Sequence, residues 1–63
     1  MEMKDIEEYI GKRVFFTLKN GFRYKILLKR EYFHGNIINF KDNQDKSVTI
    51  DIDELNFIII SNN

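Results

Sequence analysis

Two alternating apolar runs meet at Asn20-Gly21, and this arrangement strongly restricts the folds that the chain can adopt. Over residues 13–19 and again over residues 22–29, the pattern repeats every second position, which is typical of β-strands. An Asn-Gly pair between two such runs predicts a tight hairpin, because both central residues of a type I′ turn need positive φ. The second run also places Arg23 and Lys25 on one side, which indicates a solvent-exposed outer face of a sheet.

Three further strands are expected after this hairpin. One covers Phe33 to Lys41, and Asp42-Asn43-Gln44-Asp45 then supplies residues that favour a turn. The next strand, Val48 to Asp53, alternates regularly, and after an interruption at Asp53-Glu54 a final strand runs from Phe57 to Ile60. The chain is therefore predicted to be mostly β.

A short helix is predicted before the first strand, over about residues 4–10. Asp5 can act as its N-cap, with Glu8 as the capping-box partner three positions later. Gly11 is a natural end for this helix, because glycine adopts positive φ without strain. A helix of this length is unstable alone, so its apolar face must pack on the strands. That face consists of Met3, Ile6, Tyr9 and Ile10.

Size and composition predict one domain, residues 1–63, that needs an additional source of stability. A single core in a chain of 63 residues stabilises the fold only weakly. The sequence has no cysteine and one histidine, which excludes a disulfide, a thiolate metal site and a histidine-rich metal cage. Self-association is the remaining source. The run Phe57 to Ile60 is apolar on both faces, so we expect it to pair with another subunit, although it could instead close the barrel of a monomer.

Several classes of protein are disfavoured. No stretch approaches the roughly 20 apolar residues of a membrane span, and the first residues lack the apolar core of a signal peptide. We therefore expect a cytoplasmic protein with no membrane partner. His34 is the single candidate catalytic base, and the carboxylates of Asp51 and Asp53 alternate as on a solvated strand face. Catalytic residues, a metal site and a cofactor are accordingly not expected.

Charge is segregated along the chain, although the net charge is zero. Residues 12–30 contain seven basic residues and no acid, whereas residues 1–11 and 31–63 carry net charges of −3 and −4. Such segregation can create a face that binds polyanions. It can equally let basic and acidic strands pair, either within the fold or between subunits.

The segment from Arg30 to Asn36 is the best candidate for a binding site. It combines a basic residue, Arg30, with Tyr32, Phe33, His34 and the amide of Asn36 in a predicted loop. Aromatic rings stack on the bases of single-stranded RNA, at about 1–3 kcal/mol per base, and amides form hydrogen bonds with base edges. The structural alternative places Phe33 in the core, leaves His34 as an ordinary surface residue and uses Asn36 in a turn.

The order of the predicted elements resembles the Sm-like family, which includes the LSm proteins and bacterial Hfq. Gly11-Lys12-Arg13-Val14 and Leu18-Lys19-Asn20-Gly21 look like the start of the first Sm motif, and Ile50 to Ile58 looks like the second. The resemblance covers roughly residues 4–60. It implies a five-stranded, strongly bent antiparallel small barrel of the Sm-like or SH3-like kind, over about residues 12–60.

The resemblance also implies a function, that of a homo-oligomeric ring of six or seven subunits that binds single-stranded RNA. The implied RNA-binding residues are Arg30, Tyr32, Phe33, His34 and Asn36. Sm subunits join the fourth strand of one to the fifth of the next, so the implied interface comprises Val48, Ile50, Ile52, Phe57, Ile58, Ile59 and Ile60.

The sequence departs from the family at four places. Ile26, Tyr32 and Gly35 stand where the family usually has Gly, Asp and Met, and Asp51-Ile52 stands where it usually has Arg-Gly. The acid in place of a basic residue favours an alternative function, an Sm-like assembly or protein-interaction module that does not bind nucleic acid.

Overall fold

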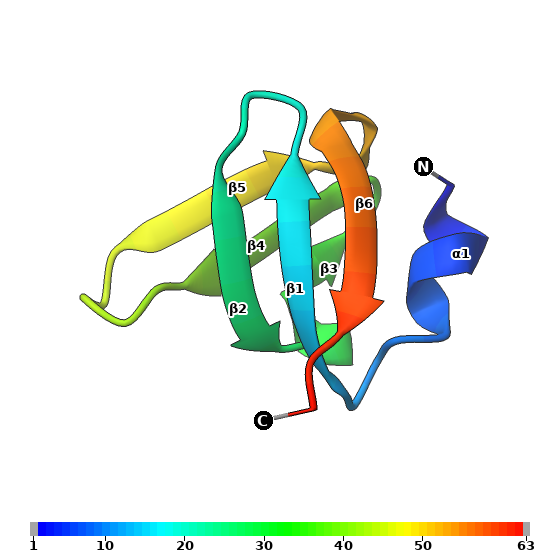
Figure 1. The fold of residues 1–63 in the computed structure, drawn as a ribbon, viewed down its shortest axis with the longest axis horizontal. Helices are drawn as coiled ribbons and strands as arrows, with labels where there is room; N and C mark the ends of the chain where they lie inside the picture. Colours follow the sequence, from blue (N-terminus) through cyan, green and yellow to red (C-terminus); the bar gives the residue numbers. More distant parts are fainter. Residues whose placement is uncertain (1, 63) are drawn as a thin grey trace.

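The computed structural model describes residues 2–62, which form a mostly β structure with one short N-terminal helix. Six strands make two three-stranded antiparallel sheets, one in front of the other in Figure 1. The front sheet has the order β2-β1-β6 and the back sheet the order β3-β4-β5. The mostly β class is confirmed, but residues 2–62 contain six strands rather than five, and the two sheets that they form are not joined into a closed barrel.

The front sheet is built on β1 (Arg13–Leu18), with β2 (Arg23–Leu27) on one side and β6 (Leu55–Ile60) on the other. Side chains of β1 alternate between the buried and the outer face, as the period of two predicts. Phe16 is fully buried and meets Phe40 from the back sheet, with ring centroids 6.4 Å apart. The core therefore lies between the two sheets. Its buried members are Ile6, Val14, Phe16, Leu18, Leu28, Ile38, Phe40, Ile50, Ile52, Leu55 and Ile58.

The hairpin between β1 and β2 is confirmed, but its turn is not the predicted type I′. The N–H of Leu18 donates to the carbonyl of Phe22 (2.8 Å), which leaves a loop of three residues instead of two. Gly21 has a φ of 93°, whereas Asn20 does not have positive φ. The reason is local, because the Asn20 side chain accepts a hydrogen bond from the N–H of Phe22 (2.9 Å) and so lengthens the loop.

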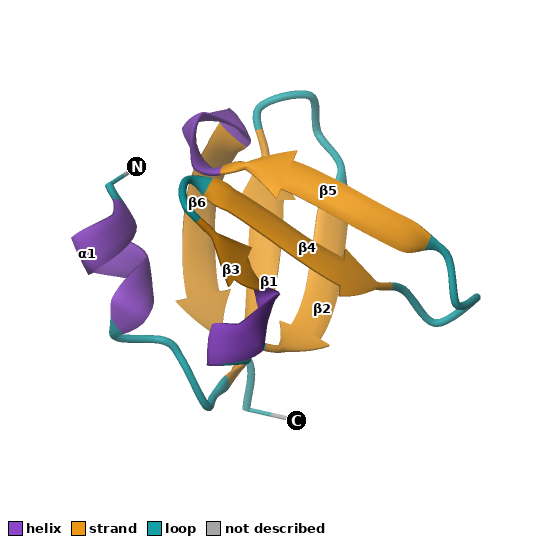
Figure 2. Cartoon of the chain, turned by 180° about the vertical axis from the view of Figure 1, so that it is seen from behind, coloured by secondary structure: helices purple, strands orange, loops and turns teal. Residues whose placement is uncertain are grey.

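The expected third strand, Phe33 to Lys41, is divided in two. β3 (Phe33–His34) and β4 (Ile37–Lys41) pair with each other around a turn at Gly35-Asn36. Gly35 has a φ of 61°, which lets the chain reverse direction there. Figure 2 shows the resulting back sheet, in which the short β3 covers only one end of β4.

The expected fourth strand ends early, since β5 covers Ser47–Asp51 and the chain then enters a 3₁₀ turn, η2 (Ile52–Glu54). The Asp51 carboxylate accepts a hydrogen bond from the N–H of Asp53 (2.9 Å) and caps this turn. The prediction that Asp51 and Asp53 lie on one face of a strand is therefore wrong, because Asp53 lies in η2. The final strand consequently begins at Leu55, two residues before Phe57.

The N-terminal helix, α1 (Met3–Glu7), is shorter than predicted. Glu2 rather than Asp5 occupies the N-cap position, and Glu8 is the C-cap. The predicted apolar face is confirmed, because Ile6 is fully buried and Met3, Tyr9 and Ile10 pack against the core. In Figure 1 the helix lies beyond the outer edge of β6. No helix within residues 2–62 is long and apolar enough to cross a membrane.

Gly11 is not the end of the helix as predicted, because α1 ends at Glu7 and residues 8–11 form turns. Its φ is 89°, and its N–H donates to the carbonyl of Leu28 at 2.7 Å. This bond ties the segment that follows α1 to the end of β2, and so positions the helix against the sheets.

Candidate functional site

The segment from Arg30 to Asn36 is not one loop. Arg30 and Tyr32 lie in a 3₁₀ turn, η1 (Arg30–Tyr32), and Phe33 and His34 form β3. Tyr32 and Phe33 are half-buried and pack against the core, whereas Arg30, His34 and Asn36 are exposed. The carbonyl of Asn36 accepts the N–H of Ile52 (2.9 Å), so this residue serves the turn and also fixes the start of η2.

A surface hollow of about 390 Å³ lies beside this segment. It brings together two of the predicted residues, Tyr32 and His34, with side chains of the adjacent strand β4. Arg30, Phe33 and Asn36 do not line it. Its lining consists of Glu31, Tyr32, His34, Asn39, Phe40 and Lys41.

The ring of Tyr32 is held in place on the inner side of this hollow. Its centroid lies 6.2 Å from that of Phe40, with the two planes inclined by 41°. The ammonium group of Lys29 lies 6.0 Å from the centroid of Tyr32, within the range of a cation–π interaction. A ring fixed in this way presents its remaining surface to a ligand at little cost in side-chain entropy.

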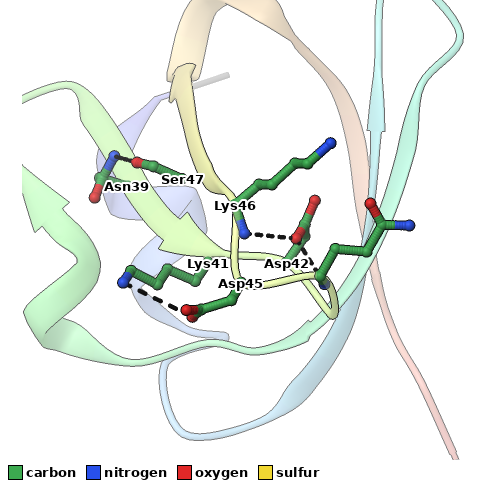
Figure 3. Close-up of polar contacts among 7 residues, drawn as sticks. Asn39, Lys41, Asp42, Asp45, Lys46 and Ser47 are labelled. Atoms are coloured by element: carbon green, nitrogen blue, oxygen red, sulfur yellow. Dashed lines mark hydrogen bonds and ion pairs between the residues drawn. The ribbon is translucent and has the colours of Figure 1, made fainter.

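Asn39 was not predicted from the sequence, and its orientation is well defined. Its amide nitrogen donates to the Thr49 hydroxyl (2.8 Å), the Ser47 hydroxyl (3.1 Å) and the Val48 carbonyl (3.3 Å). The Val48 carbonyl can only accept, so this contact identifies the nitrogen end of the amide, and Figure 3 shows that the oxygen points away from Ser47. No described residue donates to that oxygen, so it can accept a hydrogen bond from a ligand.

Lys41 adds a cation at the rim of the hollow. Its ammonium group lies 3.7 Å from the Asp45 carboxylate, with both side chains exposed, so the ion pair is weak and easily exchanged. The turn that carries Asp45 is fixed by Asp42, whose Oδ1 accepts the N–H groups of Gln44 (2.8 Å) and Lys46 (3.0 Å). Figure 3 shows the bond to Lys46.

The lining of the hollow combines several kinds of polar and aromatic group. It offers an aromatic ring, an imidazole, an amide oxygen and a cation, with Glu31 as its one acid. His34 makes no hydrogen bond or ion pair with another described residue. Within residues 2–62, no three His, Asp or Glu side chains are grouped as metal ligands.

The residues predicted for subunit contact fall into two groups. Ile50, Ile52 and Ile58 are buried in the core, and Val48 is half-buried against it, so their side chains stabilise the subunit itself. The others are exposed on β6: Phe57 by 45%, Ile59 by 50% and Ile60 by 48%. The two strands that carry these residues, β5 and β6, are nevertheless sheet edges, because within residues 2–62 β5 pairs only with β4 and β6 pairs only with β1.

The predicted basic face is confirmed as the outer face of the front sheet. Arg23, Lys25 and Leu27 are exposed on β2, and Tyr24 and Ile26 point toward the core. The Lys25 ammonium group lies 5.4 Å from the centroid of Phe15 on the neighbouring strand. This contact holds the cation on the outer face.

Comparison with known proteins adds no relative: no family model, no curated protein and no solved structure matches this chain.

Proposed function

We propose that this chain is a subunit of an Sm-like homo-oligomeric ring that binds single-stranded RNA in the hollow beside Tyr32 and His34. The observation that carries the proposal is the grouping of a fixed aromatic ring, an imidazole, an unoccupied amide oxygen and a cation in one hollow. These groups suit a base and its phosphate. Stacking of a base on such a ring contributes about 1–3 kcal/mol.

Each group has a separate role in this proposal. A base stacks against Tyr32 and His34, whose side chains line the same hollow. The Asn39 oxygen accepts an N–H from the base edge, because its own amide nitrogen is already occupied by β5. Lys41 neutralises a phosphate, and its weak pairing with Asp45 leaves it free to do so.

Ring assembly is supported by the two free strand edges. β5 and β6 each have one unpaired side, as the proposed junction between subunits requires. The strongly bent five-stranded barrel is also part of the proposal. In this barrel β2 and β3 count as one bent strand that η1 interrupts, so the six strands become five. Several copies of a weak site in one ring would bind a single RNA with higher affinity than one copy.

The test is RNA binding by the purified protein, with its native mass and the ratio of its absorbance at nucleic-acid and protein wavelengths measured first. Short uridine-rich and adenine-rich RNAs are titrated at low and high salt. We expect an oligomer whose affinity falls with salt, and a severalfold loss of affinity in His34→Ala and in Lys41→Ala. Lys46→Ala is the matched control, because Lys46 is an exposed lysine of the same turn that does not line the hollow. No affinity for either RNA at low salt would refute the proposal.

A second candidate function is an assembly or protein-interaction module without nucleic-acid binding. The outer face of β6 favours it, because Phe57 and Ile59 are exposed and lie opposite Thr17 and Phe15 on β1. Glu31 in the hollow also disfavours an RNA phosphate there. A stable oligomer that is free of nucleic acid and has no RNA affinity would support this second function.

A further inference from the structure

The outer edge of β2 is unpaired. The N–H of Leu28 donates to Lys12 and that of Leu18 donates to Phe22, so the even-numbered residues of β2 form the hydrogen-bonded pairs with β1. The N–H and C=O groups of Arg23, Lys25 and Leu27 therefore point away from β1. Since β2 ends the front sheet, no described residue satisfies them. Such a row of groups is a template for one more strand.

A second hollow, of about 340 Å³, lies along this edge. It exists because β2 and β4 are not hydrogen-bonded to each other, so the two sheets separate here. The rings of Tyr24 and Phe40 contact each other within it, edge to face, with centroids 5.6 Å apart. Its lining consists of Arg23, Tyr24, Lys25, Ile26, Phe40, Asp42 and Asn43.

We infer that this groove binds an extended peptide segment in which acidic and apolar side chains alternate, and that the segment adds to β2 as a fourth strand of the front sheet. Alternate side chains of an added strand face opposite sides of the sheet. Those on the outer side lie next to Arg23 and Lys25, and those on the inner side lie over Tyr24, Ile26 and Phe40.

Charge selects acids for the outer positions. Residues 12–30 contain no acid, and the outer face of the front sheet carries Arg13, Arg23 and Lys25. The contact of Lys25 with Phe15 keeps its ammonium group on that face before any ligand arrives. Asp42 is the one acid that lines the groove, and two backbone N–H groups hold its Oδ1 in place. Its negative charge repels an acidic side chain, which reinforces the preference for apolar side chains at the inner positions.

This site is independent of the proposed RNA site and of ring assembly. The two hollows share only Phe40, and the subunit junction would use β5 and β6, which leaves β2 accessible. Either binding property can consequently fail without the other.

The probe is a fluorescent peptide of six residues that alternates Glu and Val, compared with one that alternates Lys and Val. Fluorescence anisotropy with the full chain should show binding of the Glu peptide, weaker at high salt, and at least tenfold weaker binding of the Lys peptide. Lys25→Glu should weaken the Glu peptide at least tenfold. Lys4→Glu makes the same charge change on α1 and should stay within twofold of the unmodified protein.

Two further measurements locate the bound strand without relying on a protein variant. Amide hydrogen exchange should slow at Arg23, Lys25 and Leu27 when the Glu peptide binds. Methylation of the peptide nitrogens that face β2 should abolish binding, whereas methylation of the alternate nitrogens should not. Equal affinity for both peptides, or protection confined to β5 or β6, would overturn the inference. So would oligouridine that displaces the peptide and loses affinity in Lys25→Glu, since the groove would then be a nucleic-acid site.

Discussion

Replacement of Phe40 by Leu tests how the two sheets are held together. Phe40 is 3% exposed and its ring contacts three others, those of Phe16 and Tyr24 from the front sheet and that of Tyr32 from η1. Aromatic pairs contribute about 0.5–1.5 kcal/mol each beyond the area that they bury. Two of the three ring pairs are tilted rather than edge to face, so we place their contributions in the lower part of this range. The three pairs together then predict that Phe40→Leu lowers the free energy of unfolding by about 2–3 kcal/mol.

This loss is large for so small a domain. At 0.05–0.15 kcal/mol per residue, the total stability of 63 residues is roughly 3–9 kcal/mol. The melting temperature should fall by roughly 10–20 °C, since 1 kcal/mol corresponds to about 4–8 °C in a domain of this size. Urea denaturation followed by circular dichroism gives the free energy of unfolding directly.

A double-mutant cycle isolates the ring contact from the loss of volume. Phe40→Leu combined with Tyr24→Leu should give a coupling energy of about 0.5–1.5 kcal/mol. Phe40→Leu combined with Phe22→Leu is the control, because Phe22 is 61% exposed and makes no ring contact with Phe40, and this pair should be additive. If the Tyr24 coupling is below about 0.3 kcal/mol, which is the limit of additivity, the ring contacts do not hold the sheets together.

Two more predictions concern the turn after β4 and the free edge of β6. Asp42→Ala should lower the free energy of unfolding by about 1–2 kcal/mol, because the Oδ1 of Asp42 accepts two backbone N–H groups. Asp42→Asn keeps an accepting oxygen and should retain most of this stability. Equal losses for the two variants in urea denaturation would contradict this account. Ile60→Pro should dissociate the proposed ring in analytical ultracentrifugation yet leave a folded subunit, because the Ile60 N–H faces the free edge. Ile59→Pro removes an N–H that is bonded to β1 and should destabilise the subunit by about 3 kcal/mol or more, so identical behaviour of the two variants would argue against edge pairing.

The parts of the fold that could be predicted from the sequence are those set by local pattern. The alternation around Asn20-Gly21 correctly predicts a hairpin and its outer face, and helical spacing correctly predicts the apolar face of the N-terminal segment that packs on the core. The errors arise where one side chain competes with the pattern. Asn20 captures a backbone N–H and lengthens its turn, and Asp51 caps a 3₁₀ turn within what otherwise resembles a strand.

The candidate site was predictable only in part. Tyr32 and His34 belong to one short segment that is rich in aromatic residues, and so they were identified from the sequence. Asn39 and Lys41 come from the adjacent strand, and the pairing register that places them beside His34 depends on the Gly35 turn. Their alternation with Ile38 and Phe40 marks them as outward-facing residues, but alternation alone does not say which neighbour they meet.

The pairing of β1 with both β2 and β6 sets an order of events during folding. The β1–β2 and β4–β5 pairs are hairpins whose strands are close in sequence, whereas β1 meets β6 through pairs such as Val14 with Ile60. Contacts between residues so distant along the chain require the closure of a long loop, which slows their formation. The two hairpins should therefore form early and β6 should dock late. In that interval the bare edge of β1 is a second strand template, and the rate of docking of β6 decides how long a neighbouring chain can reach it.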